Sequence, residues 1–220
     1  MTILYDQLAS ALQPGMTIPK PLELLFSWIE SKGQFIDAPG GKRIGFLFPQ
    51  DKIDNEETDT ERPGGTIIQF EAQGNIYLEY WFGHNRPEVL NRLCVFAKTG
   101  ADGSMAAFWL DDDGREKIVH LGSGSGSTLV CILADDPIDF LRLLAIGYDE
   151  ICWSEEFSEP PNSNCDELFV QPNVDYQNWV RDTFSVTIPM MANEIVQCPS
   201  EMDDDGSDDA FWIWTKQNAN

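Results

Sequence analysis

Positively charged residues and histidines are scarce in this chain. Its 220 residues include 14 lysines and arginines and 2 histidines against 37 aspartates and glutamates, a formal net charge of −23 at pH 7. So acidic a chain repels nucleic acid and anionic membranes, and we expect neither as a partner. The scarcity is greatest in residues 118–220, which hold 19 acidic residues and three basic ones, Arg142, Arg181 and Lys216. This half would attract a basic protein partner, although an acidic surplus equally serves solubility.

Long hydrophobic runs and paired cysteines are also missing. No apolar stretch approaches the roughly 20 residues of a membrane span. The first residues, Met-Thr-Ile-Leu-Tyr-Asp, lack the basic start and apolar middle of a signal peptide, so we expect a cytoplasmic protein. The five cysteines are dispersed, with no Cys-x-x-Cys pair, so we expect neither a disulfide framework nor a zinc site. Cys94 and Cys131 lie in apolar runs and are predicted to be core residues.

Glycine-rich and acidic segments lack the spacing that would give them chemistry. Residues 122–127 read G-S-G-S-G-S and lead into an apolar strand, whereas a phosphate loop needs a helix N-terminus and a lysine, so we expect a flexible connection. The aspartate runs at 111–113 and 203–209 miss the alternating ligands of a calcium loop. They are predicted to be a hairpin turn and a solvated loop.

The two histidines do not complete a catalytic set. His84 lies in a turn and His120 ends a strand, and both are predicted to be surface or capping residues. No combination of acid, base and nucleophile can be named. We therefore expect no enzyme activity, no catalytic residues, no metal and no cofactor.

Hydrophobic periodicity predicts an α+β fold with a curved, mostly antiparallel sheet in a single domain, 1–220. Helical spacing is found in four segments: 3–12 (weaker), 21–32, 136–146 and 175–184. Strands are predicted at 44–48, 66–72, 76–82, 93–98, 105–110, 117–121 and 128–134. The aromatic end at 210–214 should dock on the core. Acidic loops are expected at 50–65, 158–166 and 200–209.

The helix at 136–146 has the clearest boundaries. Asp135 or Asp136 can act as its N-cap, Pro137 suits its first turn, and Gly147 ends it. Leu144 shares its apolar face, so this helix is predicted to supply core rather than chemistry.

Trp153 is an exception among the tryptophans. Most of the seven occupy periodic apolar positions and are predicted to be core residues, but Trp153 is followed by Ser-Glu-Glu-Phe and then Pro-Pro-Asn. An aromatic residue flanked by acids is typical of an anchor for a basic partner. The candidate partner-binding residues lie in one acidic patch, Asp149 to Glu159, and are Trp153, Glu155, Glu156, Phe157 and Glu159. Two further acidic patches, Asp166-Glu167 and 203–209, lack an aromatic anchor.

The run F-L-R-L-L-A-I-G-Y-D-E at 140–150, preceded by H-L-G-S-G-S at 120–125, resembles the strand-and-helix signature of the SUKH superfamily. The superfamily is named in part for a yeast cell-wall assembly regulator. D-Y-Q-N-W-V-R-D-T-F at 175–184 and D-A-F-W-I-W at 209–214 resemble the C-terminal part of a bacterial branch. The likeness covers roughly the last half of the chain by residues and the first half by the order of elements.

This resemblance implies an α+β fold with helices packed on a curved, mostly antiparallel sheet. It also implies a bacterial immunity protein that binds and neutralises a toxin. The family supplies no catalytic residues, and its binding surface varies with the partner, so no binding positions are carried over. The alternative is a regulatory or scaffold interaction protein without a toxin partner, as the yeast relatives suggest.

Overall fold

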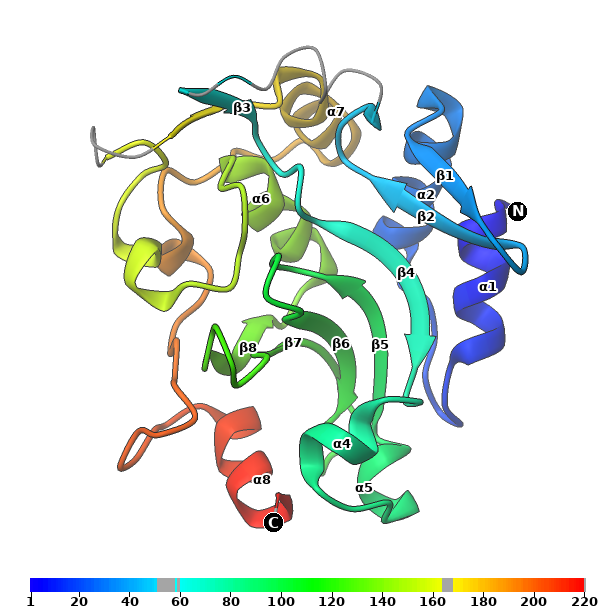
Figure 1. Ribbon diagram of the computed structural model, residues 1–220, viewed down its shortest axis with the longest axis vertical. Coiled ribbons are helices and arrows are strands. Elements are labelled where there is room, and N and C mark those ends of the chain that lie inside the picture. Colours follow the sequence, from blue (N-terminus) through cyan, green and yellow to red (C-terminus); the bar gives the residue numbers. More distant parts are fainter. Residues whose placement is uncertain (51–57, 59, 164–167, 220) are drawn as a thin grey trace.

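The centre of the molecule is a curved sheet in which every neighbouring pair of strands is antiparallel (Figure 1). The computed structural model describes residues 1–50, 58, 60–163 and 168–219. The sheet has seven strands in the order β1-β2-β4-β5-β6-β7-β8. Their bounds are β1 Phe35–Ala38, β2 Lys42–Phe46, β4 Gln69–Gly74, β5 Leu93–Lys98, β6 Met105–Leu110, β7 Glu116–Leu121 and β8 Val130–Ala134.

The four strands from β5 to β8 carry buried residues on both faces of the sheet. Along β6, Ala106 and Phe108 pack into one hydrophobic cluster, whereas Ala107 and Trp109 pack into another on the opposite side. Successive strand residues point to opposite faces, so a sheet covered on both faces needs apolar residues at every position. This requirement explains the continuous apolar runs in these strands.

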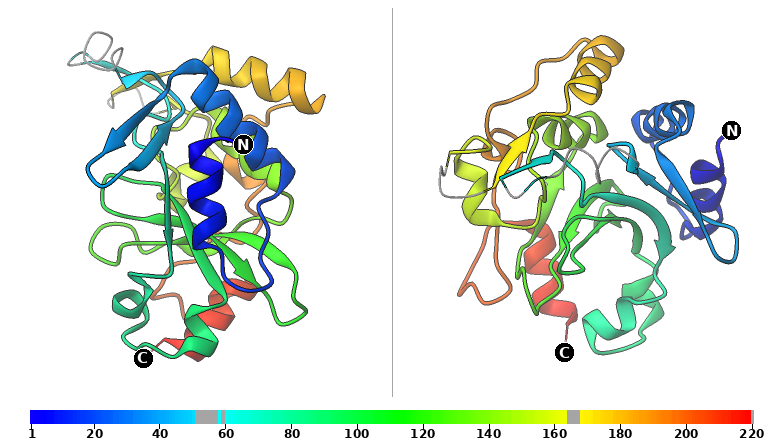
Figure 2. Two further views of the ribbon diagram at one scale, coloured as in Figure 1. Left: turned by 90° about the vertical axis from the view of Figure 1, so that its right-hand side faces the viewer. Right: turned by 45° about the horizontal axis from the view of Figure 1, so that its top comes forward.

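Helices cover both faces of the sheet (Figures 1 and 2). The first cluster includes residues from α1 Ile3–Ala11, α2 Lys20–Lys32, α6 Pro137–Ile146 and α7 Val174–Phe184, and from the 3-10 turns η1 Ser154–Ser158 and η2 Ala192–Glu194. The second cluster includes residues from α4 Leu78–Phe82, α5 Pro87–Leu90 and α8 Ala210–Asn218. Figure 1 places α4, α5 and α8 together at one end of the molecule, with α6 and α7 at the other.

The boundaries of α6 follow from its sequence. The Asp136 carboxylate accepts the Ile138 N–H at 2.8 Å, so Asp136 rather than Asp135 is the N-cap. Gly147 ends the helix in the left-handed region at a φ of 109°, where a side chain would be strained. Phe140 and Leu144 on the apolar face are buried, as the periodicity predicts.

The predicted α+β fold with a curved, mostly antiparallel sheet is confirmed, as are the helices at 3–12, 21–32, 136–146 and 175–184. The aromatic end at 210–214 docks on the second cluster as part of α8. In the part of the chain that the structure describes, no helix combines the length and apolar composition needed to cross a membrane.

The strand predicted at 76–82 is wrong. Gly74 ends β4 at a φ of 64°, and the chain then forms the short helix α4. Leu78 and Phe82, four residues apart, bury one side of that helix, while Tyr77 and Tyr80 are exposed. The burial of two apolar residues at i and i+4 on one side of a helix thus decides the structure here, although aromatic side chains generally prefer strands.

The glycine-serine segment 122–127 is not a loose connection. The Asp102 carboxylate accepts the Ser123 hydroxyl at 2.7 Å and the Ser127 N–H at 2.7 Å. A Cβ at Gly126 would lie 2.7 Å from the Cβ of Asp102, so the glycine is needed for this close approach. The segment is therefore a tight turn between β7 and β8 that Asp102 holds from one side.

The described parts of two predicted acidic loops take part in regular structure, contrary to expectation. In the described part of 50–65, Glu61–Pro63 form β3, which pairs in parallel with β9 (Phe169–Gln171), while 51–57 and 59 lie outside the described residues. In 200–209, Asp209 is buried and caps α8, accepting the Trp212 N–H at 2.8 Å and the Ile132 N–H at 2.9 Å. Its carboxylate is therefore a structural tie between α8 and the sheet edge.

Candidate functional site

The segment that follows α6 keeps Tyr148, Ile151 and Phe157 in the first hydrophobic cluster and forms the wall of a pocket with its outer side. After Gly147 the chain runs through 148–153 into η1 and continues to Pro160-Pro161. The Tyr148 hydroxyl donates to the Glu159 carbonyl at 2.7 Å and accepts the Ala192 N–H at 3.2 Å. Burial of this phenol raises its pKa above the usual value. One tyrosine therefore ties the end of η1 to the start of η2.

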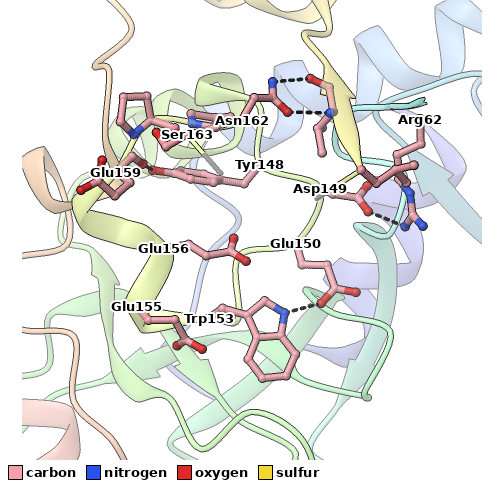
Figure 3. A pocket seen from close by; sticks show the side chains of 14 residues that line it. Arg62, Tyr148, Asp149, Glu150, Trp153, Glu155, Glu156, Glu159, Asn162 and Ser163 are labelled. Carbon is pink, nitrogen blue, oxygen red and sulfur yellow. Dashed lines mark hydrogen bonds and ion pairs between the residues drawn. The ribbon is translucent and has the colours of Figure 1, made fainter. Parts of the chain in front are cut away.

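The pocket has a volume of about 510 Å³. Most of its lining comes from residues 148–163, and the remainder comes from Arg62, Leu168 and Val170. This size lies within the range of small-ligand sites. Figure 3 shows Tyr148 and Glu159 toward one end of the pocket and Trp153 toward the other, with Glu150 and Glu156 between them.

Two carboxylates of the lining are already committed to bonds within the molecule. Asp149 pairs with the Arg62 guanidinium, Oδ2 to Nη1 at 2.7 Å, and accepts the Thr66 hydroxyl at 2.7 Å. Glu150 accepts the Trp153 indole N–H at 2.7 Å and the Ala101 N–H at 2.9 Å. These bonds position the Trp153 ring and hold the segment against the β5–β6 turn.

The other three acidic residues of the lining are exposed to solvent, and we call them the outer acids: Glu155, Glu156 and Glu159. For Glu155 and Glu159, no hydrogen bond or ion pair of the side chain to another described residue is found. Among the described residues of the lining, five side chains are acidic and one is basic, so this part of the pocket carries a strongly negative charge. A group entering it would meet this charge beside the aromatic surface of Trp153.

The candidate residues do not all face solvent. Trp153 is half-buried and lines the pocket with Glu155, Glu156 and Glu159. Phe157 is only 1% exposed and packs near Tyr148, with ring centroids 6.3 Å apart, so its predicted role as a surface anchor is wrong. Its ring supports η1 from the core side instead. Arg62 joins the pocket from a distant part of the chain, and no local sequence signal marks it.

Of the other two acidic patches, only 203–209 belongs to the described part of the chain, and none of its residues lines the pocket. Asp166 and Glu167 lie outside the described residues. At 203–209, Asp203, Asp204 and Asp205 are exposed, and Asp204 accepts the Glu201 N–H at 2.8 Å. In residues 1–50, 58, 60–163 and 168–219, no group of three or more histidine, cysteine or acidic side chains is arranged to hold a metal ion.

The ring nitrogens of both histidines form hydrogen bonds within the protein. His120 is fully buried, contrary to the prediction of a surface or capping position, and its ring nitrogens lie 2.9 Å from Leu129 O and from Thr99 Oγ1. Burial lowers its pKa to about 4. His84 Nε2 lies 2.6 Å from the Asn218 carbonyl oxygen.

The cysteines that the structure describes are free thiols. Cys94 and Cys131 are buried as predicted, and Cys152 is buried as well. Burial raises the pKa of the Cys152 thiol, which disfavours the reactive thiolate. Cys165 lies outside the described residues.

Comparisons of the chain with protein-family models, curated proteins and solved structures find no match.

Proposed function

We propose that this chain is a non-catalytic binding protein that neutralises a basic toxin domain by binding it at the acidic pocket of residues 148–163. The observation that carries the proposal is the gathering of five acidic side chains around a half-buried tryptophan. Acidic side chains at the rim accelerate encounter with a basic surface, and an aromatic anchor slows dissociation. The resemblance of 140–150 to the SUKH signature adds the immunity role.

The arrangement of the pocket favours binding rather than turnover. His120 is enclosed in the core, and neither histidine lines the pocket. The committed carboxylates Asp149 and Glu150 fix the shape of the wall, while the outer acids remain at the surface. A wall that is fixed before contact lowers the entropy cost of association.

The test begins with the genes beside the one for this chain, and a toxin domain encoded there is produced for the binding and growth experiments. Co-expression should restore growth of cells that produce the toxin. In stopped-flow mixing at low salt, Glu155→Lys with Glu156→Lys should slow association roughly tenfold, and the loss should shrink at high salt because charges are screened within about 10 Å at 0.1 M. Trp153→Ala should instead speed dissociation.

A matched control places the same charge change elsewhere. Glu79 and Glu88 are exposed residues of α4 and α5, at the opposite end of the molecule from α6 and α7 (Figure 1). Glu79→Lys with Glu88→Lys should leave the association rate within about twofold of wild type. Equal slowing by both pairs would show that only net charge matters and would remove the pocket from the interface. Neighbouring genes that encode no toxin would favour the regulatory role instead.

A further inference from the structure

The pocket lining is divided between carboxylates that are bonded internally and carboxylates that face outward. Asp149 accepts hydrogen bonds from Arg62 and Thr66, and Glu150 accepts them from Ala101, Cys152 and Trp153. Glu155 and Glu159 bring their charges to opposite parts of the same pocket, and among the described residues no hydrogen bond or ion pair of these two side chains is found (Figure 3). An entering cation can therefore pair with Glu155 and Glu159 without breaking the bonds that hold the wall.

The Trp153 ring supplies a fixed flat surface beside these charges. Its indole N–H bonds to Glu150, whose other oxygen is held by the Ala101 N–H, so rotation of the ring would break a bond of 2.7 Å. The ring is half-buried and its remaining surface lines the pocket. A fixed aromatic face next to carboxylates attracts a cation through both its π-electrons and the neighbouring charge.

The chemistry of this lining distinguishes between the two basic side chains. A guanidinium is planar, stacks on aromatic rings and carries five donors that can reach carboxylates in different directions, whereas an ammonium is a compact, strongly hydrated charge. The pocket offers two flat rings, those of Trp153 and Tyr148, and several separated carboxylates rather than one focal acid. The chain itself already seats one guanidinium in this wall, that of Arg62 on Asp149.

We propose that the pocket receives an arginine side chain of the partner, with its guanidinium against Trp153 and Glu155 and with Glu159 adding negative charge from the other end of the pocket. The inference rests on the proposed function and specifies its anchor. A volume of about 510 Å³ accommodates one such side chain together with part of the peptide that carries it.

The test measures binding of a short peptide, acetyl-Gly-Ser-Arg-Ser-Gly-amide, to the intact protein by two-dimensional NMR. The indole N–H signal of Trp153 is assigned by its absence in Trp153→Phe. The arginine peptide should shift this signal with a dissociation constant in the millimolar range, typical of a single anchored side chain. The same peptide with lysine should bind roughly fivefold more weakly, and the neutral citrulline peptide should not bind.

Variants of the pocket separate recognition from net charge. Glu155→Gln with Glu159→Gln should weaken arginine-peptide binding about tenfold, whereas Glu79→Gln with Glu88→Gln, which removes the same charge elsewhere, should change it less than twofold. Both pairs replace exposed side chains, so the variants are expected to fold.

Three outcomes would overturn the inference: equal affinity for the arginine and lysine peptides, binding of the citrulline peptide, or equal weakening by the two variant pairs. Failure of the peptide test with growth rescue intact would remove the arginine anchor and leave the toxin-neutralising role standing. Loss of rescue itself would remove the proposed function.

Discussion

Leu144 lies on the face of α6 that packs into the first hydrophobic cluster and is 3% exposed. Leu144→Asp would place an unpaired carboxylate there. We expect a loss of unfolding free energy of roughly 3–5 kcal/mol, or failure to fold, because no partner compensates the lost hydration. Urea denaturation measures the loss. Ile138→Asp on the same helix is the control, since Ile138 is partly exposed and should lose much less. A Leu144→Asp protein with the wild-type midpoint would contradict the placement of this face.

His120 makes the stability of the fold depend on pH. Its Nδ1 must donate to the Leu129 carbonyl, so its Nε2 accepts the Thr99 hydroxyl, and the neutral ring satisfies both bonds. Burial lowers its pKa from 6.5 to about 4, so the unfolded chain binds a proton that the folded chain excludes. Stability attributable to this ring is therefore complete above pH 6.5 and falls as the pH drops toward 4, by about 3 kcal/mol in all.

The measurement compares wild type with His120→Gln. The comparison is needed because carboxylates also titrate between pH 6.5 and 4, and their effect on stability is common to both proteins. Unfolding free energies are taken at pH 7, 6, 5 and 4.5. The difference between the two proteins should shrink as the pH falls from 6.5, since only the wild type loses the contribution of the ring. Parallel curves would show that His120 does not carry this dependence.

The candidate partner-binding residues show how far neighbouring residues in the sequence predict whether a side chain is exposed. The acidic flanks of Trp153 were sufficient to predict Glu155, Glu156 and Glu159 at the surface. The position of Phe157 was not predictable in the same way, because residues 154–158 form a 3-10 turn with three residues per turn. Ser154 and Phe157 then share a side, and Phe157 points inward while the glutamates between them point outward.

Helix α1 packs against the sheet where β2 carries a glycine. A Cβ at Gly45 would lie 2.8 Å from Leu4 Cδ1 and 3.1 Å from Ile29 Cγ2, and both of these residues are buried. We expect Gly45→Ala to destabilise the protein by roughly 1–3 kcal/mol through overpacking. Thermal unfolding measures the change. Gly206→Ala serves as the control because nothing lies within 4 Å of its Cβ, so it should be nearly neutral. Equal melting temperatures for the two variants would contradict the close approach of α1.

Local elements were predictable where one physical signal dominates. Capping by Asp136, the left-handed Gly147 and the spacing of Leu144 all agree on α6. The parallel pairing of β3 with β9 has no such signal, because more than a hundred residues separate Glu61 from its partner Phe169 and Glu-Arg-Pro suits a loop equally well. Arg62 enters the pocket through this pairing, which explains why the sequence did not place it there.

The net charge of −23 acts on the whole molecule. Folding brings the carboxylates together, so their repulsion opposes the compact state and salt should relieve it. Raising NaCl from about 0.02 to 0.2 M should add roughly 1 kcal/mol of stability, equivalent to about 2–4 °C in melting temperature. Calorimetry measures this shift. Over the same range association with a basic partner should become slower, and a melting temperature that falls with salt would contradict the repulsion.

Residues 148–163 divide into buried side chains that hold the fold and exposed side chains that can vary without disturbing it. Tyr148 and Phe157 anchor the segment from inside, whereas Glu155, Glu156 and Glu159 are exposed to solvent. Substitutions at the three outer positions should therefore change the free energy of unfolding by less than about 0.5 kcal/mol, as surface changes usually do. Under the proposed function, the specificity of the surface can therefore be changed one charge at a time to match a different partner, while the buried part of the segment stays the same.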